Sequence, residues 1–279
     1  MGKAAPLRAA VAMDFSTIEV AVTGARGSLT LNRADKLNPL STTTLHELVD
    51  AARLFDSRPE VKVVVVAGKG RSFSAGADLA AFERPGDPAG TGAGGTSATI
   101  SREAADAGRR MAEAIEAMRA VTIARLHGHC VGGALVLAAA CDLRVAAEDT
   151  RFSIPEVDLG VPLAWGGIPR LVREIGPALT KELVMTCRPF TAAEARAAGF
   201  VNRVVPAPLL DAEVEDLVAG LERKSAFTLS ATKRHTTAVT DGMVGTARAW
   251  NDADSLVTAL RDPDSRAAGA AYLERVRRR

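Results

Sequence analysis

The sequence predicts an α/β fold with an all-helical C-terminal part. Val61 to Gly68 is almost continuous valine, which is typical of a strand buried on both faces. Shorter β-prone runs and segments with helical periodicity alternate around it up to about residue 205. From Pro208 onward, apolar residues recur three and four positions apart, and no further strand is predicted. Alternating strands and helices followed by helices alone indicate an α/β core with a helical appendage.

The individual elements follow from periodicity and turn residues. Two short strands at 18–22 and 28–31 flank a hairpin-like turn. Ser41 is a suitable N-cap for a helix over 40–55. Further strands are expected at 121–126, 143–146 and 151–154, and further helices at 102–118, 168–175, 180–186 and 192–198. We therefore expect a flexible extension over 1–12, a core over 13–205 and a helical region over 206–279.

Composition narrows the class of protein. The chain has 279 residues, is 47% hydrophobic and 24% charged, and carries a net charge of +2, which gives no reason to expect a nucleic-acid partner. No apolar run is long enough to span a membrane, and the N-terminus is not a secretory signal. The three cysteines lack metal-ligand spacing and indicate buried thiols in a reducing compartment: Cys130, Cys141 and Cys187. We expect a cytoplasmic enzyme without a metal or cofactor, ending in a solvated basic tail, Arg275 to Arg279.

Two glycine turns carry the chemical signal. Each follows a Val-rich strand and leads into helix-capable sequence: Phe73 to Leu79 in the first case, and His127 to Asp142, HGHCVGGALVLAAACD, in the second. Ligands of α/β proteins bind at the carboxyl ends of strands, where such turns cluster. Backbone N–H groups just after each glycine have no intrahelical acceptor and can bind an anion. Two of them converging would form an oxyanion hole. Alternatively, the glycines only permit close packing of helix and strand.

Neither turn has the pattern of a phosphate loop. Beside them, the run Arg84 to Ser101 is rich in Gly, Ala, Pro, Ser and Thr, and predicts a mobile loop that lines the pocket and orders with ligand.

Five segments, in order, make the chain resemble the crotonase (enoyl-CoA hydratase/isomerase) superfamily over nearly its whole length. Leu31 to Leu40 is similar to the family's LNRPxxxNAL segment and Phe73 to Leu79 to its FxAGADL turn. His127 to Asp142 is similar to its NGxxxGGG turn and the CD that follows. The other two segments, 152–171 and 192–205, are similar to FxxPExxLGxxPxxGGxxRL and TAxEAxxxGLVxxVV.

The resemblance implies a crotonase-like spiral of ββα units, a helical C-terminal trimerisation region, and homotrimers or hexamers. It also implies an acyl-CoA thioester as substrate, with coenzyme A entering as part of that substrate. The N–H groups of Ala77 and Gly133 would form the oxyanion hole. The positions that would contact the CoA or acyl part are Lys36, Leu37, Ala75, Gly76, Asp78, Leu79, Gly132 and Trp165. Asp78 could instead cap a following helix, and Trp165 could be a core residue.

The candidate acid/base is Glu156. The family's hydratases use two glutamates, of which one stands three residues after the glycine of the hole, and Val136 takes that place here. The second follows a proline and corresponds to Pro155-Glu156. If Glu156 is buried among apolar neighbours, its pKa should rise toward the range useful for proton transfer. His129 lies before the glycines and is expected to be a loop residue, while Asp158 is expected to be structural.

One carboxylate facing an oxyanion hole suits Δ3,Δ2-enoyl-CoA isomerisation, which needs no bound water. The additional acid of the family's dienoyl isomerases is replaced by Leu163-Ala164-Trp165. A hydratase whose water is held by another group remains an alternative, as do a non-catalytic acyl-CoA binding protein and a thioester hydrolase or decarboxylase.

Overall fold

A six-stranded sheet forms the centre of the molecule. The computed structural model describes residues 14–78, 98–249 and 251–278, so the predicted extension over 1–12, Leu79 and residues 84–97 of the predicted loop lie outside the described residues. The strand order is β1-β2-β3-β4-β6-β9, and only β1 and β2 pair antiparallel. The strands are β1 (Ile18–Thr23), β2 (Arg26–Leu31), β3 (Val63–Gly68), β4 (Val121–Leu126), β6 (Leu143–Ala147) and β9 (Arg203–Val205).

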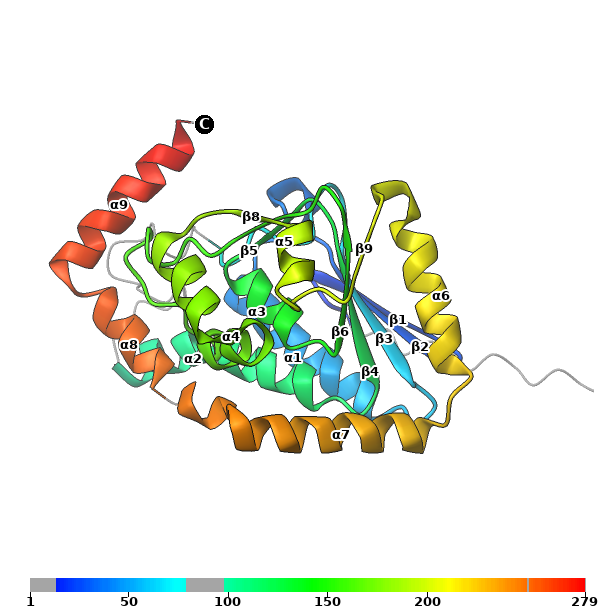
Figure 1. Ribbon diagram of the computed structural model, residues 1–279. Helices are drawn as coiled ribbons and strands as arrows, with labels where there is room; N and C mark the ends of the chain where they lie inside the picture. Colours follow the sequence, from blue (N-terminus) through cyan, green and yellow to red (C-terminus); the bar gives the residue numbers. More distant parts are fainter. Residues whose placement is uncertain (1–13, 79–97, 250, 279) are drawn as a thin grey trace, which may run out of the picture.

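The valine run forms a central strand, as predicted. β3 pairs with β2 on one side and with β4 on the other, and Val63 to Val66 are buried. Helices α1 (Thr42–Asp56), α2 (Ala98–Ala117) and α3 (Gly133–Ala139) pack on one face of the sheet, and α6 (Leu210–Glu222) packs on the other (Figure 1). A strand covered on both faces can be apolar at every position, which explains the lack of alternation.

A second, smaller sheet carries the glycine turns. It contains β5 (His129–Val131), β7 (Arg151–Ser153) and β8 (Phe190–Thr191), in that order. An isolated parallel bridge pairs Ser74 with Cys130, so the first glycine turn lies beside β5. Strands β5, β8 and β9 are absent from the sequence-based prediction, because runs of two or three residues are too short to show periodicity.

The helical half of the chain follows the predicted pattern closely. α4 spans Gly167–Thr186 but is interrupted at Gly176, which has φ of 75°, just before Pro177. This break separates the two helices predicted there. α5 (Ala192–Ala197) begins at a capping box of Thr191 and Glu194. α7 (Ala226–Met243) runs along the lower edge of the view in Figure 1, followed by α8 (Asp252–Ala259) and α9 (Pro263–Arg277).

The structure corrects two sequence-based expectations and refines a third. α2 begins at Ala98, so the last residues of the predicted mobile loop are helical. The basic tail is exposed to solvent over 275–278, as expected, but it is helical up to Arg277, and Arg275 pairs with Asp158 at 3.0 Å. Cys130 and Cys141 are buried thiols as expected, but Cys187 is only partly buried.

Two buried cations tie the core to distant segments. Arg144 on β6 donates to the carbonyl oxygens of Ala138 and Cys141 at the C-terminal end of α3, and also to that of Phe200. Lys233 on α7 donates to Ala120 O at 3.1 Å and pairs with Asp142 at 2.7 Å. Since carbonyls at a helix end lack partners, Arg144 fixes the orientation of α3.

No helix within the described ranges has the length and apolarity needed to cross a membrane.

Candidate active site

The register of the small sheet brings both glycine turns and Glu156 to one place. Cys130 pairs with Ser74 on one side and with Phe152 on the other, all in parallel. Three residues past Ser74 the chain reaches Ala77, and three past Cys130 it reaches Gly133. The residues that follow Phe152 lead to Glu156. Because the carboxyl ends of parallel strands meet at one edge, three segments far apart in sequence converge.

The two turns are in direct contact. A Cβ placed on Gly76 would lie 3.5 Å from the Gly133 nitrogen and would overlap the Val131 carbonyl oxygen. Gly76 and Gly132 both have left-handed backbones, with φ of 88° and 51°. A side chain at either position would be strained by its φ as well as by these contacts, so both turns require glycine.

Neither predicted N–H donor is engaged by the bridge or the helix to which its residue belongs. Leu40 forms a parallel bridge with Ala77 through the two residues that flank Ala77. The Leu40 N–H donates to Gly76 O at 2.8 Å, and the Leu40 carbonyl accepts from Asp78 N at 3.2 Å. The Ala77 N–H therefore faces away from Leu40. Gly133 is the first residue of α3, so its N–H has no acceptor within the helix. This arrangement can stabilise an oxyanion.

Glu156 lies against the second turn. A Cβ on Gly132 would overlap Glu156 Oε1 and would lie 3.1 Å from its carboxyl carbon. Part of the residue is accessible, but Oε2 is buried and accepts no hydrogen bond from the described residues. Burial raises the pKa of Glu156 to about 7, which confirms the expectation from its apolar surroundings. A carboxyl group in this state can both accept and return a proton near neutral pH.

Val136 is buried on the first turn of α3, with 2% of its surface exposed. A Cβ on Gly167 would lie 2.9 Å from Val136 Cγ2 and 2.9 Å from Leu163 Cγ, so Val136 packs into an apolar cluster at the start of α4. No carboxylate stands at this position of the hole. His129 is exposed, as expected, and its Nδ1 lies 3.2 Å from Ser72 Oγ, but it is the first residue of β5 and not a loop residue.

Trp165 lies on the other side of the second turn. A Cβ on Gly133 would lie 2.9 Å from Trp165 Cε3 and would overlap Cζ3, and a Cβ on Gly108 of α2 would overlap the indole as well. The ring is therefore inserted between α2 and the start of α3. Trp165 has φ of 62°, an unusual backbone for a large side chain that costs about 1–3 kcal/mol.

The residues expected to contact coenzyme A are also brought together. Leu37 has φ of 61°, and its carbonyl accepts from Ala75 N at 2.8 Å, so the segment with Lys36 lies beside the first turn. Lys36 is exposed, and Asp78 pairs with Arg33 at 2.9 Å. Asp78 is thus engaged by Arg33. Leu79 lies outside the described residues.

Two further residues lie near the site and could not be identified from a local sequence motif. Tyr272 on α9 is half-buried, and burial together with the negative charges of Asp158 and Glu156 raises its pKa. Asp252, the first residue of α8, accepts from Gly166 N at 2.8 Å. Both stand on C-terminal helices about a hundred residues from the segments they contact, and no local motif could reveal them.

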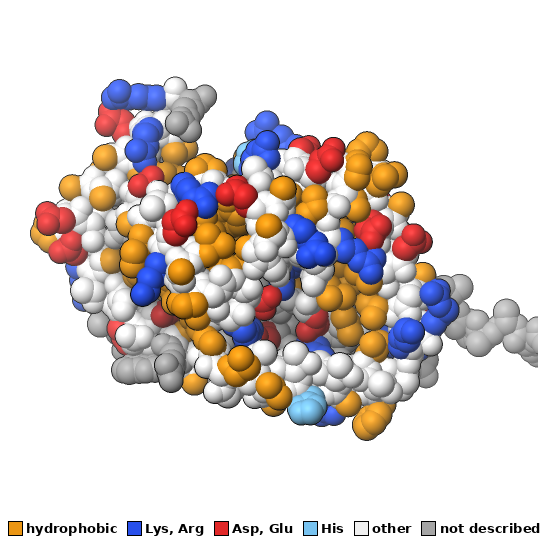
Figure 2. Space-filling view, viewed as in Figure 1, with side chains coloured by type: hydrophobic (Ala, Val, Ile, Leu, Met, Phe, Trp, Pro, Cys, Tyr) orange, Lys and Arg blue, Asp and Glu red, His pale blue; other side chains and the backbone are white. Residues whose placement is uncertain are grey.

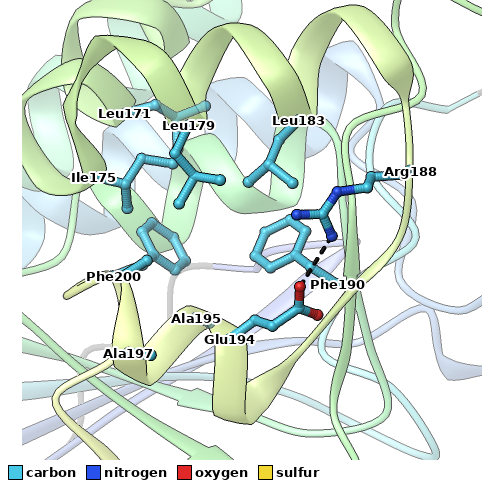
Figure 3. A pocket seen from close by; sticks show the side chains of 11 residues that line it. Leu171, Ile175, Leu179, Leu183, Arg188, Phe190, Glu194, Ala195, Ala197 and Phe200 are labelled. Atoms are coloured by element: carbon cyan, nitrogen blue, oxygen red, sulfur yellow. Dashed lines mark hydrogen bonds and ion pairs between the residues drawn. The ribbon is translucent and has the colours of Figure 1, made fainter.

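A separate apolar pocket of about 220 Å³ lies between α4 and α5 (Figure 3). Its walls include Leu171, Phe190 and Phe200, and Arg188 pairs with Glu194 at 3.0 Å at its edge. Figure 2 shows hydrophobic side chains between charged ones over these helices. None of the predicted site residues lines this pocket, so it is distinct from the candidate active site. The described residues contain no group of side chains that could hold a metal ion.

Comparison with known proteins agrees with this geometry. The family profile described as Enoyl-CoA hydratase/isomerase matches residues 24–278. The chain is 33% identical to a crotonyl-CoA hydratase of Syntrophomonas wolfei over 250 residues, which cover 88% of this chain and 91% of that protein. It is 34% identical to the peroxisomal Delta(3,5)-Delta(2,4)-dienoyl-CoA isomerase of Arabidopsis thaliana over 207 residues, 74% of each chain.

The fold is also that of solved structures. The crystal structure of an enoyl-CoA hydratase from Mycobacterium avium subsp. paratuberculosis superposes with a TM-score of 0.81 at 26% identity, covering 93% of this chain and 96% of that one. The predicted crotonase fold is thereby confirmed. With a family profile that spans most of the chain, these findings establish that the chain belongs to the enoyl-CoA hydratase/isomerase family.

Proposed function

We propose that the protein is a Δ3,Δ2-enoyl-CoA isomerase that uses Glu156 as its only acid/base. The observation that supports this most directly is the pairing of one buried carboxyl, whose pKa is raised to about 7, with an apolar residue at position 136. Hydration requires a second group to hold and activate water. Moving a proton within an acyl chain requires only one group that accepts and returns it.

The proposed reaction has two steps. The Glu156 carboxylate takes a proton from C2 of a 3-enoyl thioester, and the electron pair of that C–H bond moves toward the thioester oxygen. The N–H groups of Ala77 and Gly133 stabilise the resulting dienolate; losing one such donor typically costs about 2.7–4 kcal/mol. The protonated Glu156 then gives the same proton to C4, the C2–C3 double bond forms, and the 2-enoyl thioester is released.

Hydration of 2-enoyl-CoA is the second candidate. It is favoured by the similarity to proteins named hydratases, including the crotonyl-CoA hydratase of S. wolfei. Dienoyl isomerisation has less support, although one similar protein carries that name, because Leu163 and Ala164 are apolar and buried where an additional acid would be needed.

The test is an assay of the purified protein with straight-chain 3-enoyl-CoA and 2-enoyl-CoA. We expect 2-enoyl product from the first substrate and its loss in Glu156→Gln, by about 10²–10⁴-fold. The control variant is Glu148→Gln, since Glu148 is an exposed carboxylate on a turn. Rapid formation of 3-hydroxyacyl-CoA from the second substrate would establish the hydratase instead, and thioester binding without turnover of either substrate would indicate a binding protein.

We also propose that the chain forms trimers or dimers of trimers. Large apolar side chains are exposed on two long helices: Met185 on α4, and Phe227, Val239 and Met243 on α7. Such side chains on a surface favour association with another protein surface. Light scattering coupled to size-exclusion chromatography tests this, and a monomer at micromolar concentration would contradict it.

A further inference from the structure

We propose that Asp252 is a positioning residue that holds the Trp165 indole against Gly133, and that this indole excludes acyl groups branched at C2. The inference rests on the proposed function in one respect only: it places the thioester oxygen of the ligand at the Gly133 N–H. It assigns a role to α8, which contributes no group to the chemistry itself.

The indole occupies the space beside the oxyanion hole. It contacts the Cα atoms of both Gly108 and Gly133 closely enough that a Cβ at either would overlap the ring. The Glu156 carboxyl lies against Gly132 in the same manner. Gly132 thus contacts the proposed proton acceptor, and the next residue, Gly133, contacts the indole. C2 of a bound thioester is one bond from the carbonyl carbon, so a substituent on C2 comes within reach of the indole.

The backbone that presents the indole is held by distant side chains. Trp165 and Gly166 are consecutive left-handed residues, with φ of 62° and 70°. Asp252 accepts from Gly166 N at 2.8 Å, while Arg170 Nη1 donates to Gly166 O at 3.2 Å. Arg170 is fully buried and pairs with Glu116 on α2 at 2.5 Å. A strained conformation persists only where its surroundings fix it, and here α4 and α8 fix it from both sides.

The hydrogen bond from Gly166 N to Asp252 can be kept or removed by substitution at position 252. It is half-buried, and its carboxylate also faces the charges of Arg109, Asp106 and Arg170. Asparagine keeps an oxygen that accepts from Gly166 N, whereas alanine removes it. Asp254 provides the matched control, because it lies on the same helix but pairs with Arg102 at 2.7 Å.

The experiment measures dissociation constants for hexanoyl-CoA and 2-methylhexanoyl-CoA by calorimetry. Both acyl groups are saturated, so neither can be isomerised or hydrated. We expect the unmodified chain to prefer the straight chain by roughly 10-fold or more. Asp252→Ala and Trp165→Ala should each bring the preference close to one, and the double variant should lose nothing further because Asp252 acts through Trp165. Asp252→Asn and Asp254→Ala should keep the preference.

A spectroscopic measurement tests the positioning directly. The chain has two tryptophans, so a Trp250→Phe background reports on Trp165 alone. Asp252→Ala should shift the Trp165 emission to longer wavelength as the ring becomes more exposed. Asp252→Asn should leave the emission wavelength unchanged.

Three results would overturn the inference: no preference in the unmodified chain, an unchanged preference in Asp252→Ala, or an effect of Asp252→Ala that persists without Trp165. If an alanine variant does not fold, Asp252→Leu, which keeps a similar shape but cannot accept from Gly166 N, and Trp165→Phe, which has a smaller ring, give the comparison. Full isomerase activity in Glu156→Gln would refute the proposed function but would leave these binding results unaffected, so the two failures can be told apart.

Discussion

The Glu156 carboxyl lies so close to Gly132 that a Cβ on residue 132 would overlap its Oε1 atom. Glycine at 132 therefore makes room for the carboxyl group as well as permitting a φ of 51°. The carboxyl has little water around it, and this burial raises its pKa to about 7.

The activity should follow the ionisation of Glu156. Only the carboxylate can take the C2 proton, so kcat/KM for 3-enoyl-CoA should rise as pH increases through about 7 and then level off. Burial raises the pKa of the nearby Tyr272 above its usual value, so its ionisation is not expected to add a step in this range. A rate independent of pH between 5 and 9, measured at subsaturating substrate, would argue against Glu156 as the base.

Because its pKa is raised, Glu156 should lower the stability of the folded protein at high pH. Its folded pKa exceeds the unfolded value of 4.5, so the folded state holds the proton more tightly and stability falls as pH rises from about 4.5 through 7. The loss is at most about 3 kcal/mol. Glu156→Gln should remove this slope and exceed the unmodified chain in free energy of unfolding at pH 8, measured by urea denaturation. Glu148→Gln should leave the slope unchanged.

The effect of Gly108→Ala on stability should change sign when Trp165 is replaced by alanine. With Trp165 present, the added methyl overlaps the indole and should destabilise the protein by about 1–3 kcal/mol. Trp165→Ala removes the three nearest atoms, and replacing a helical glycine should then stabilise the protein by about 0.5–1 kcal/mol. Gly220→Ala on α6 is the control, because its nearest neighbour would be 3.9 Å away, and it should stabilise both backgrounds. Equal effects of Gly108→Ala in the two backgrounds would show that the indole does not lie there.

Val136→Glu should add hydration of 2-enoyl-CoA to the activities of the protein. The new carboxylate would stand on the first turn of α3, three residues after Gly133, which is the place of the second glutamate in the hydratases that the chain resembles. Because position 136 is buried, we expect a loss of about 1–3 kcal/mol in stability. Val136→Gln has a similar shape without the charge and should show no gain. If Val136→Glu folds and gains no hydratase activity, position 136 does not correspond to the hydratase glutamate.

Arg144→Met should be among the most destabilising substitutions outside the site. It removes the donors to the carbonyl oxygens at the end of α3 and the 2.6 Å ion pair of Glu174, which keeps only the longer pair with Arg173 at 4.0 Å. Breaking such a buried arrangement costs about 3–5 kcal/mol. Arg203→Met breaks an exposed pair with Glu213 and should cost about 0–1 kcal/mol. Similar losses in the two variants, measured by chemical denaturation, would contradict the role given to Arg144.

Local signals in the sequence were sufficient for the main elements. Ser41 and Thr191 both cap the helices predicted to follow them, since each side chain accepts from the backbone N–H three residues on. The valine run of β3 identified a central strand because its burial on both faces is visible residue by residue. The extent of α2 was underestimated, because its first residues, from Ala98, continue a Gly- and Ala-rich run without apolar periodicity.

The candidate site was predictable where chemistry depends on residue type. Glu156, Gly76, Gly132 and Val136 could be singled out because a carboxyl, a glycine or an apolar side chain at a given place in a motif can be seen directly, and the structure shows the contact of Glu156 with Gly132. The roles of Gly108 and Asp252 could not be predicted, since they depend on which helix crosses which turn. That information lies in the packing of α2 and α8 and not in any local pattern.

The contact of Lys233 with Ala120 and Asp142 also determines when the protein can finish folding. The cation and the Ala120 carbonyl are separated by 113 residues, and the lysine belongs to a helix near the end of the chain. While a ribosome is still translating the segment before α7, Asp142 already stands just before β6, but Lys233 is not yet there to pair with its charge. Closure of the core at this end therefore requires α7, and it belongs to the contacts of large sequence separation, which form late because a long loop must close first.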